Sequence, residues 1–320
     1  MNDTYLSWIE SEIRKEKFGA RPVSLYEPLR YIMSLGGKRL RPLLTLLAYS
    51  LYKKDVRKIV PIANAVEIFH NFTLLHDDIM DNAPLRRGKP AVHKKWNVST
   101  AILAGDVMQI KVYDLLVRID DAKIKDVLMA FNRCATEICE GQQWDMEFEG
   151  RDRVSEVEYI KMTRLKTAVL LGFSLELGAI LAGAGLHDRK ALREFGINIG
   201  VGFQLKDDLL DVFANKKKFG KVIGGDIMAN KKTFLLIKAM AMAKGKERKT
   251  LMAWLEKKKF NNRNKVEAIT AIYETLNLRN ITEKKARHFF EKGSLSLEGI
   301  KGPNKKVLLQ FAKDLMDRQT

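Results

Sequence analysis

The sequence predicts an all-α fold, and three observations carry that prediction. Seven prolines in 320 residues lie well below the usual ~5%, so few residues break helices. Apolar residues recur every three or four positions through most of the chain, whereas the period-two alternation of strands is hard to find. With 46% hydrophobic and 30% charged residues, the chain can bury a large core but is too polar for an ordinary membrane protein.

Local signals predict where helices begin and where they are interrupted. Expected N-caps are Ser99, Asp188 and Ser155, the last in a capping box with Glu158. The glycines Gly36, Gly37 and Gly141 are expected to interrupt helices. No linker rich in proline, glycine or serine divides the chain, which predicts a single domain over residues 1–320.

One segment, Ala168–Gly185, is apolar for nearly the length of a membrane span. Glu176 lies at its centre and small residues dominate its second half, so we expect a buried core helix and no stable membrane insertion. The first residues lack the pattern of a secretory signal, and Cys134 and Cys139 cannot form a disulfide framework or complete a zinc site. These features predict a cytoplasmic protein.

The net charge of +18 would attract nucleic acid, anionic membranes or phosphorylated small molecules. No zinc-finger, RNA-recognition or helix-turn-helix signature accompanies this charge, so we do not expect a nucleic-acid partner. The choice among the remaining partners depends on motifs.

Two acidic motifs carry the functional argument. Leu75–Asp81 and Leu205–Asp211 each end an apolar helical run with the pattern DDxxD. On a helix the first and last aspartates share a face, and the middle one lies about 100° around. Such a fan of carboxylates is costly beside apolar residues unless cations bind to it. Because Mg²⁺ prefers a few carboxylates together with substrate phosphates, the pair predicts a metal-bridged diphosphate site, with a solvated acidic helix end as the alternative.

Basic residues lie on both sides of the first acidic motif. The block Gly36–Pro42 (GGKRLRP) supplies three cations at a glycine turn leading into a helix, where backbone N–H groups favour anions. The segment Arg86–Lys89 follows the first DDxxD closely. Either run alone is an ordinary surface patch, but charges of alternating sign differ from the uniformly basic face of a nucleic-acid binder.

Taken in order, these motifs resemble a known family. Blocks match from Gly36 to Thr233: GGKRLRP, HNFTLLHDDIMDNAPLRRGKP, GD at Gly105-Asp106, EGQQWD and KT at Lys166-Thr167, and FQLKDDLLD with FGKVIGGD and NKKT. The chain is similar to the trans-polyprenyl diphosphate synthases of the isoprenyl synthase family. The resemblance implies an antiparallel helix bundle around a deep central cavity, usually in a homodimer. In the last block, Asn230 stands where the family usually has glycine.

The resemblance also assigns roles to single residues. It gives Mg²⁺ (or Mn²⁺) and the allylic diphosphate to Asp77, Asp78, Asp81, Asp207, Asp208 and Asp211. It gives the clamp on that diphosphate to Arg86, Lys166, Lys221 and Lys231, and the isopentenyl diphosphate site to Lys38, Arg41, His70 and Arg87. Thr167 and Gln204 would stabilise the carbocation, and Phe72 would close the tunnel for the growing chain.

The implied reaction condenses isopentenyl diphosphate with dimethylallyl, geranyl or farnesyl diphosphate to give geranylgeranyl or farnesyl diphosphate. Two alternatives stay open, a class I terpene cyclase and a non-catalytic partner subunit. The cyclase would normally carry an Asn/Ser/Glu arrangement at the second motif, and the silent subunit would have lost part of a motif. Nearby, His76 is expected to bond backbone, Asp145 to support a basic residue and Gln142 to line the cavity.

Overall fold

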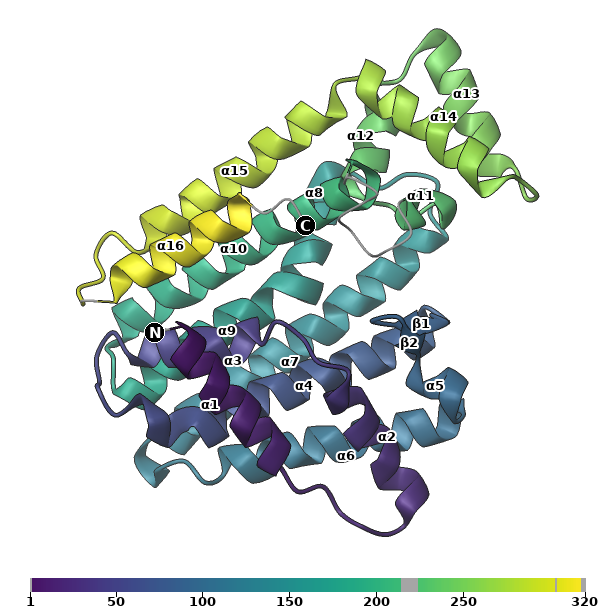
Figure 1. Cartoon of the computed structure of the whole chain (residues 1–320). Coiled ribbons are helices and arrows are strands. Elements are labelled where there is room, and N and C mark those ends of the chain that lie inside the picture. Colours follow the sequence, from purple (N-terminus) through teal and green to yellow (C-terminus); the bar gives the residue numbers. More distant parts are fainter. Residues whose placement is uncertain (1, 214–223, 303, 318–320) are drawn as a thin grey trace. The chain divides into compact units, whose positions relative to one another are not determined.

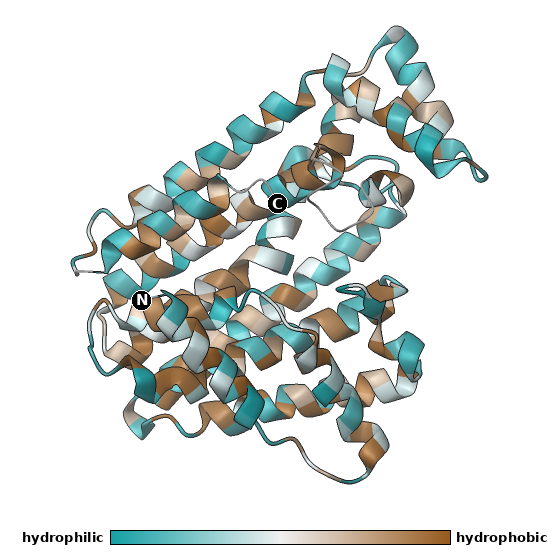
Figure 2. Ribbon diagram, viewed as in Figure 1, coloured by the Kyte–Doolittle hydropathy of each residue, from teal (hydrophilic) through white to brown (hydrophobic). Residues whose placement is uncertain are grey.

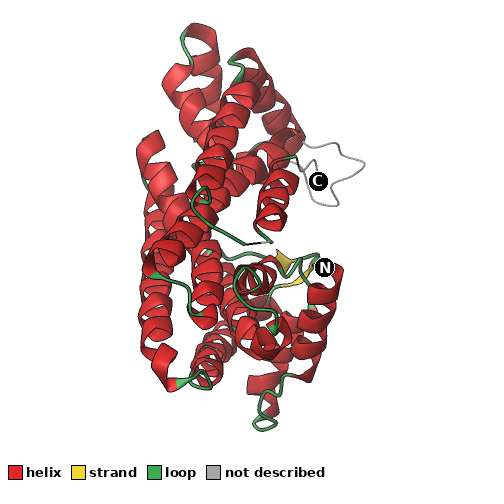
Figure 3. Ribbon diagram, turned by 90° about the vertical axis from the view of Figure 1, so that its left-hand side faces the viewer, coloured by secondary structure: helices red, strands yellow, loops and turns green. Residues whose placement is uncertain are grey.

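The computed structural model describes residues 2–213, 224–302 and 304–317. Helices dominate this part of the chain, as Figure 3 shows, and the all-α prediction is confirmed. The one pair of strands within the described residues is a short antiparallel hairpin of β1 (Leu85–Arg86) and β2 (Lys89–Pro90).

The chain forms two compact units, so the prediction of one domain over residues 1–320 stays a prediction. The first unit comprises Met1–Cys134, Leu170–Arg193 and Ile300–Lys305, and the second comprises Ala135–Val169, Glu194–Gly299 and Lys306–Thr320. Three long helices, labelled in Figure 1, contain residues of both units: α7 (Asp121–Glu149), α9 (Val169–Ala182) and α10 (Leu186–Phe213).

The first unit is built around α4 (Val60–Met80), which packs most extensively against α6 (Val98–Leu116) and also against α3 (Leu40–Tyr49). Its other helices are α1 (Asn2–Lys15), α2 (Val23–Ser34), η1 (Val56–Ile59) and α5 (Val92–Lys95). An aromatic cluster fills its centre, in which Phe131 makes edge-to-face or tilted contacts with Phe69, Tyr113 and Phe173 at centroid distances of 4.9, 5.2 and 5.7 Å.

The second unit has its core between α10, α12 (Phe234–Met242), α14 (Asn262–Thr275) and α15 (Leu278–Ser296), where side chains such as Leu209, Leu235 and Tyr273 are buried. Its further elements are α8 (Glu156–Thr163), the π-helical turn η2 (Arg164–Ala168), α11 (Gly225–Met228), α13 (Gly245–Glu256) and α16 (Lys305–Met316). The outer helices α15 and α16 carry both apolar and polar residues along their length (Figure 2). In α16, Leu308, Phe311, Ala312 and Leu315 form the buried face.

The apolar segment proves to be a core helix, as predicted. Only one helical run, Glu156–Ala182, is long and apolar enough to cross a membrane among the described residues, and 83% of its apolar window is buried. Glu176 is tolerated within it because Arg133 and Arg193 approach its carboxylate to 2.6 and 3.5 Å.

The local signals gave mixed results. The capping box of Ser155 and Glu158 is confirmed at the start of α8. The Ser99 prediction is wrong by two residues, because the Asn97 side chain caps α6 by accepting from the Thr100 N–H. Asp188 lies inside the first turn of α10 rather than before it. Gly141 does not interrupt a helix but lies within α7.

Candidate active site

The first aspartate motif lies at the C-terminal end of α4. Asp78 is 1% exposed, and Arg86 donates to both its carboxylate oxygens, with Nε at 3.0 and 3.1 Å. Arg86 also lies 3.7 Å from Asp77, because the β1–β2 hairpin folds back beside the helix end. Carboxylates are disfavoured at a helix C-terminus, where the backbone carbonyls carry partial negative charge. The motif is therefore a site that favours cations.

The predicted isopentenyl diphosphate residues come together in the first unit. Arg41 donates through Nη1 to His70 Nε2 at 3.1 Å, and Arg87 donates to the carbonyl oxygen of Gly36. Gly36 has φ of 77°, so the turn that carries Lys38 has a left-handed backbone suited to glycine. Because arginine can only donate, His70 accepts at Nε2 and its proton lies on Nδ1.

Electrostatics at this cluster favour an anion. Burial lowers the pKa of His70 well below its usual value, and the neighbouring charges of Arg41 and Arg87 lower it further. Burial also lowers the pKa of Arg41 to about 10. Both shifts reflect positive charges crowded away from water, which a bound diphosphate would neutralise.

One of the three cations of the GGKRLRP block is not available to an anion. Arg39 is 4% exposed, and its guanidinium pairs with Glu10 at 2.8 Å and with Glu67 at 2.7 Å. The expectation of three anion-binding cations in this block is corrected to two, Lys38 and Arg41. The sequence could not show this, because both carboxylates come from other helices.

The second aspartate motif occupies the last turns of α10. Asp208 is 3% exposed, and its carboxylate accepts from the Tyr159 hydroxyl at 2.6 Å and from the Phe234 N–H at 3.1 Å. Burial and the charge of Asp226 raise the pKa of Asp208 to about 7. Asp208 thus joins α10 to α8 and to the start of α12, a role that no sequence signal indicated.

Asp211 supports the start of α11. Its carboxylate accepts from the Asp226 N–H at 3.0 Å, and its carbonyl accepts from the Gly224 N–H at 2.7 Å. Asp207 lies one turn earlier on the same helix and is half-buried. The outer two aspartates of this motif are therefore more accessible than Asp208.

Lys166 Nζ lies 2.6 Å from the Asp145 carboxylate, so Lys166 is the basic residue that Asp145 supports. Lys166 and Thr167 lie in the π-helical turn η2, a rare conformation that recurs at functional sites. Gly141 explains how α7 comes so near: a Cβ there would lie 2.2 Å from the backbone nitrogen of Lys166. The glycine therefore permits a close helix approach rather than ending a helix.

A hydrogen-bonded chain links the two residues predicted to face the carbocation. Thr167 Oγ1 donates to Gln204 Oε1 at 3.4 Å, and Gln204 Nε2 donates to Asp208 at 3.1 Å. Since Thr167 gives its only hydroxyl hydrogen to Gln204, both hydroxyl lone pairs are left to interact with positive charge.

The loop carrying Lys231 is anchored by a residue that the sequence did not single out. Lys265 is fully buried, and its ammonium donates to Asn230 Oδ1 at 2.6 Å and to the Met228 carbonyl at 3.3 Å. Asn230 has φ of 54°, the left-handed conformation for which the family usually has glycine. Lys231 is exposed at the end of this loop, whereas Lys221 lies outside the described residues.

The donor set fits magnesium in a specific way. Within the described chain, no three histidine, cysteine or carboxylate side chains lie close enough to hold a metal ion alone. A site with so few protein ligands needs substrate phosphates and water to complete it, and this is the coordination that Mg²⁺ prefers. The carboxylates of Asp78 and Asp208 already accept protein hydrogen bonds, but an ionised carboxylate has about four lone-pair sites, so these bonds leave capacity for a metal.

The remaining predicted residues lie along α4. Phe72 is half-buried, with its ring 5.5 Å from Phe69 and 4.7 Å from His76. Phe72 extends the aromatic cluster of the first unit toward the aspartate motif. His76 Nε2 lies 3.3 Å from the Ile102 carbonyl, which agrees with a backbone hydrogen bond. Gln142 Nε2 is buried without a hydrogen-bond partner in the described structure.

Comparisons with known proteins agree with these motifs. The polyprenyl synthetase family model matches residues 22–273. The geranylgeranyl diphosphate synthase of Methanosarcina mazei is 39% identical over 305 residues, covering 93% of this chain and 91% of that protein. The farnesyl diphosphate synthase of Geobacillus stearothermophilus is also 39% identical, over 235 residues, covering 70% of this chain and 78% of that protein. The crystal structure of geranylgeranyl pyrophosphate synthetase from Pyrococcus horikoshii matches with a TM-score of 0.92 and 32% identity, over 99% of this chain and 97% of that one.

Because the family model matches most of the chain and near-full-length relatives share more than a third of their residues with it, the chain belongs to the polyprenyl synthetase family.

Proposed function

We propose that the chain is a short-chain trans-prenyltransferase, which condenses isopentenyl diphosphate with an allylic diphosphate in the cytoplasm and releases pyrophosphate. The allylic substrate is dimethylallyl, geranyl or farnesyl diphosphate. The observation that carries the proposal is the presence of both aspartate motifs, one in each compact unit, on helices α4 and α10. Geranylgeranyl diphosphate is the favoured product and farnesyl diphosphate the second choice.

Binding of the two diphosphates draws on different residues. Arg86, Lys166, Lys221 and Lys231 clamp the allylic diphosphate, and Lys38, Arg41, His70 and Arg87 bind isopentenyl diphosphate. The aspartates of both motifs would hold Mg²⁺ or Mn²⁺: Asp77, Asp78, Asp81, Asp207, Asp208 and Asp211. The metal, when bound, neutralises charge on the leaving diphosphate.

The reaction is an electrophilic substitution that needs no protein nucleophile. Cationic side chains stabilise the departing pyrophosphate while the allylic C–O bond breaks, and the electron pair leaves with the oxygen. Thr167 and Gln204, which share a hydrogen bond, would stabilise the allylic cation with the lone pairs of the hydroxyl and of the amide carbonyl. The double bond of isopentenyl diphosphate then forms the new C–C bond, and the proton lost afterwards passes to pyrophosphate.

The deciding experiment is product chromatography of the purified chain with isopentenyl diphosphate and each allylic primer. Elongated prenyl diphosphates are expected with Mg²⁺ and none in excess EDTA. Asp77→Ala and Asp207→Ala should each lower kcat by roughly 10²–10³-fold, the loss typical of removing one charge-stabilising group. Asp314→Ala, an exposed aspartate on α16, is the matched control.

Other outcomes would replace the proposal. Cyclic hydrocarbons from a single allylic diphosphate would indicate a terpene cyclase. Absence of turnover with every primer, together with activation of a second chain, would indicate a non-catalytic partner subunit. Full turnover in EDTA would exclude the metal-dependent mechanism.

We also propose a homodimer formed through α6. Leu103, Ile110 and Val117, the last at the C-cap, are 57%, 61% and 60% exposed, and their spacing of seven places them on one side of this helix and its end. Ile102 adds a fourth apolar side chain, 43% exposed. A row of exposed apolar residues on one helix face is typical of an interface with another helix.

A further inference from the structure

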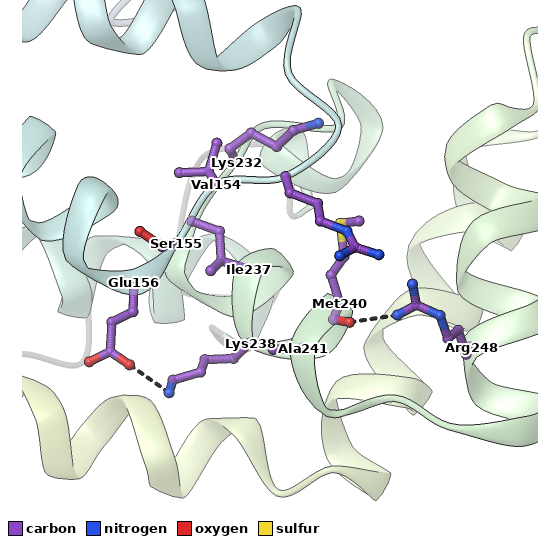
Figure 4. A pocket seen from close by; sticks show the side chains of 10 residues that line it. Val154, Ser155, Glu156, Lys232, Ile237, Lys238, Met240, Ala241 and Arg248 are labelled. Atoms are coloured by element: carbon purple, nitrogen blue, oxygen red, sulfur yellow. Dashed lines mark hydrogen bonds and ion pairs between the residues drawn. The ribbon is translucent and has the colours of Figure 1, made fainter.

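A cavity of about 560 Å³ lies wholly within the second unit and contains none of the residues assigned above to substrates. Its walls come from the segment before α8, from the start of that helix, from α12 and from α13. Volumes of this size are typical of small-molecule sites. Figure 4 shows its lining side chains.

Four cationic side chains and one carboxylate line this cavity: Arg153, Lys232, Lys238, Arg248 and Glu156. Glu156 is already engaged, because Lys238 and Lys285 lie 2.5 and 2.8 Å from its carboxylate. Partial burial alone would raise the pKa of Glu156, but the two lysines lower it. Glu156 therefore stays ionised, and its negative charge is balanced by these lysines. The carboxylate therefore does not offset the other three cations.

Those three cations, Arg153, Lys232 and Arg248, make no ion pair with any carboxylate in the described part of the chain. Arg248 is held in place by donating from Nη1 to the Met240 carbonyl at 2.7 Å, the contact drawn at one side of Figure 4. One N–H is used in this way, and a guanidinium has five, so the others remain for an anion. Several cations at one cavity favour a multiply charged anion over a single carboxylate.

The rest of the lining is apolar. Val154 and Ile237 are buried at 9% and 6% exposure, and Met240 and Ala241 complete the wall. A ligand that contacts both the cations and the apolar wall has a phosphate or diphosphate group joined to an apolar body. An inorganic anion would satisfy only the cations.

We propose that this cavity, the α8–α12 pocket, binds an organic phosphate with an apolar chain, at a site separate from the residues that bind the reacting substrates. Prenyl diphosphates are the available members of this class if the proposed function is correct, and that choice of ligand rests on it. The pocket itself rests only on its lining.

Calorimetric titration of the full chain with geranylgeranyl diphosphate in Mg²⁺ tests the proposal. Two molecules per chain are expected for the wild type and for Lys246→Gln/Lys249→Gln, a control that removes two exposed charges of α13 outside the pocket. Arg153→Gln/Arg248→Gln should bind one molecule, with the second weakened at least about tenfold. Glutamine at position 248 keeps a donor for the Met240 carbonyl.

A second calorimetric titration uses pyrophosphate in place of geranylgeranyl diphosphate. Pyrophosphate should bind the pocket at least about tenfold more weakly, because it cannot cover the apolar wall. Equal affinities would overturn the assignment to an apolar phosphate. One site in the wild type, or two unchanged sites in Arg153→Gln/Arg248→Gln, would overturn the pocket.

Prenyl transfer at low substrate is measured on the same samples. It should be equal in the wild type and both double variants, since neither removes a residue assigned to the reaction. If the wild type has no prenyl transfer but still binds a molecule that Arg153→Gln/Arg248→Gln loses, the proposed function fails while the pocket stands.

Discussion

At the scale of single residues, buried polar partners determine where the proposed site residues point. Lys265 illustrates this, because its ammonium lies 2.6 Å from Asn230 and 4.1 Å from the centre of the Phe260 ring. Burial lowers the pKa of this lysine, so the contacts must offset a cost of desolvation. We infer that they fix Asn230 in its left-handed conformation, and with it the position of Lys231.

We predict that Lys265→Met lowers kcat/KM for the allylic substrate about tenfold, because the Asn230 side chain loses its buried donor. In an Asn230→Gly background the same change should cost little, since glycine adopts positive φ without a side-chain anchor. Steady-state kinetics of the four proteins measures the coupling. Equal costs of Lys265→Met in both backgrounds would show that Lys265 acts only on overall stability.

We predict that Lys38→Ala and Arg41→Ala each raise KM for isopentenyl diphosphate about tenfold or more, with a smaller effect on the allylic KM. The reason is that Arg41 and its His70 partner lie with Arg87 in a cationic cluster of the first unit. Lys58→Ala, at a side chain 69% exposed, is the charge-matched control. If only the KM for the allylic substrate rises, Lys38 and Arg41 belong to the allylic site and not to the isopentenyl diphosphate site.

We predict that Phe72→Ala yields longer prenyl chains. Phe72 borders the aromatic cluster and lies before the first aspartate motif on α4. Removing its ring would open space for further isoprene units. Product chromatography measures the chain lengths, and thermal unfolding is measured in parallel. An unchanged distribution with a lower Tm would mean that Phe72 serves only packing.

At the scale of elements, helix ends organise the second unit. The N-terminus of α8 is closed by the Ser155–Glu158 capping box, in which the Ser155 N–H donates to the Glu158 carboxylate at 2.8 Å. Those hydrogen bonds and nearby Arg151 lower the pKa of Glu158 to about 2. The folded-state pKa lies below the unfolded one, so the stabilisation is present above the unfolded pKa and is lost as pH falls through the folded one.

We predict that Glu158→Gln lowers the free energy of unfolding by ~0.5 kcal/mol at neutral pH, because glutamine keeps the capping hydrogen bond but loses the negative charge that stabilises a helix N-terminus. The difference from wild type should stay constant above about pH 4.5 and shrink as pH falls toward 2. Urea unfolding at several pH values measures it. A difference that grows on acidification would contradict the assigned direction of the pKa shift.

At the scale of the whole molecule, we expect the exposed apolar face of α6 to form the proposed dimer interface. We predict that Leu103→Glu/Ile110→Glu converts a dimer into a monomer in light scattering coupled to size exclusion, because two charges would have to be buried at the interface. Leu186→Glu, at an isolated leucine 71% exposed, should leave the dimer intact. A dimer that survives the double substitution would exclude this face as the interface.

The sequence by itself determined the helical class, the two aspartate motifs, the family and those contacts that depend on short spacing. The Ser155–Glu158 box lies within one helical turn, where neighbours three residues apart must meet. The sequence also predicted that Asp145 supports a basic residue, and the structure identifies that residue as Lys166.

The tertiary structure alone decided which polar and charged residues serve the fold. Arg39 pairs with Glu10 and Glu67, Asp208 accepts from Tyr159, and Asn230 accepts from Lys265, each across 28 or more residues of sequence. Gly141 read as a helix breaker and is a point of helix contact. Such pairings depend on how helices pack in three dimensions, whereas periodicity and capping are set by neighbours along the chain.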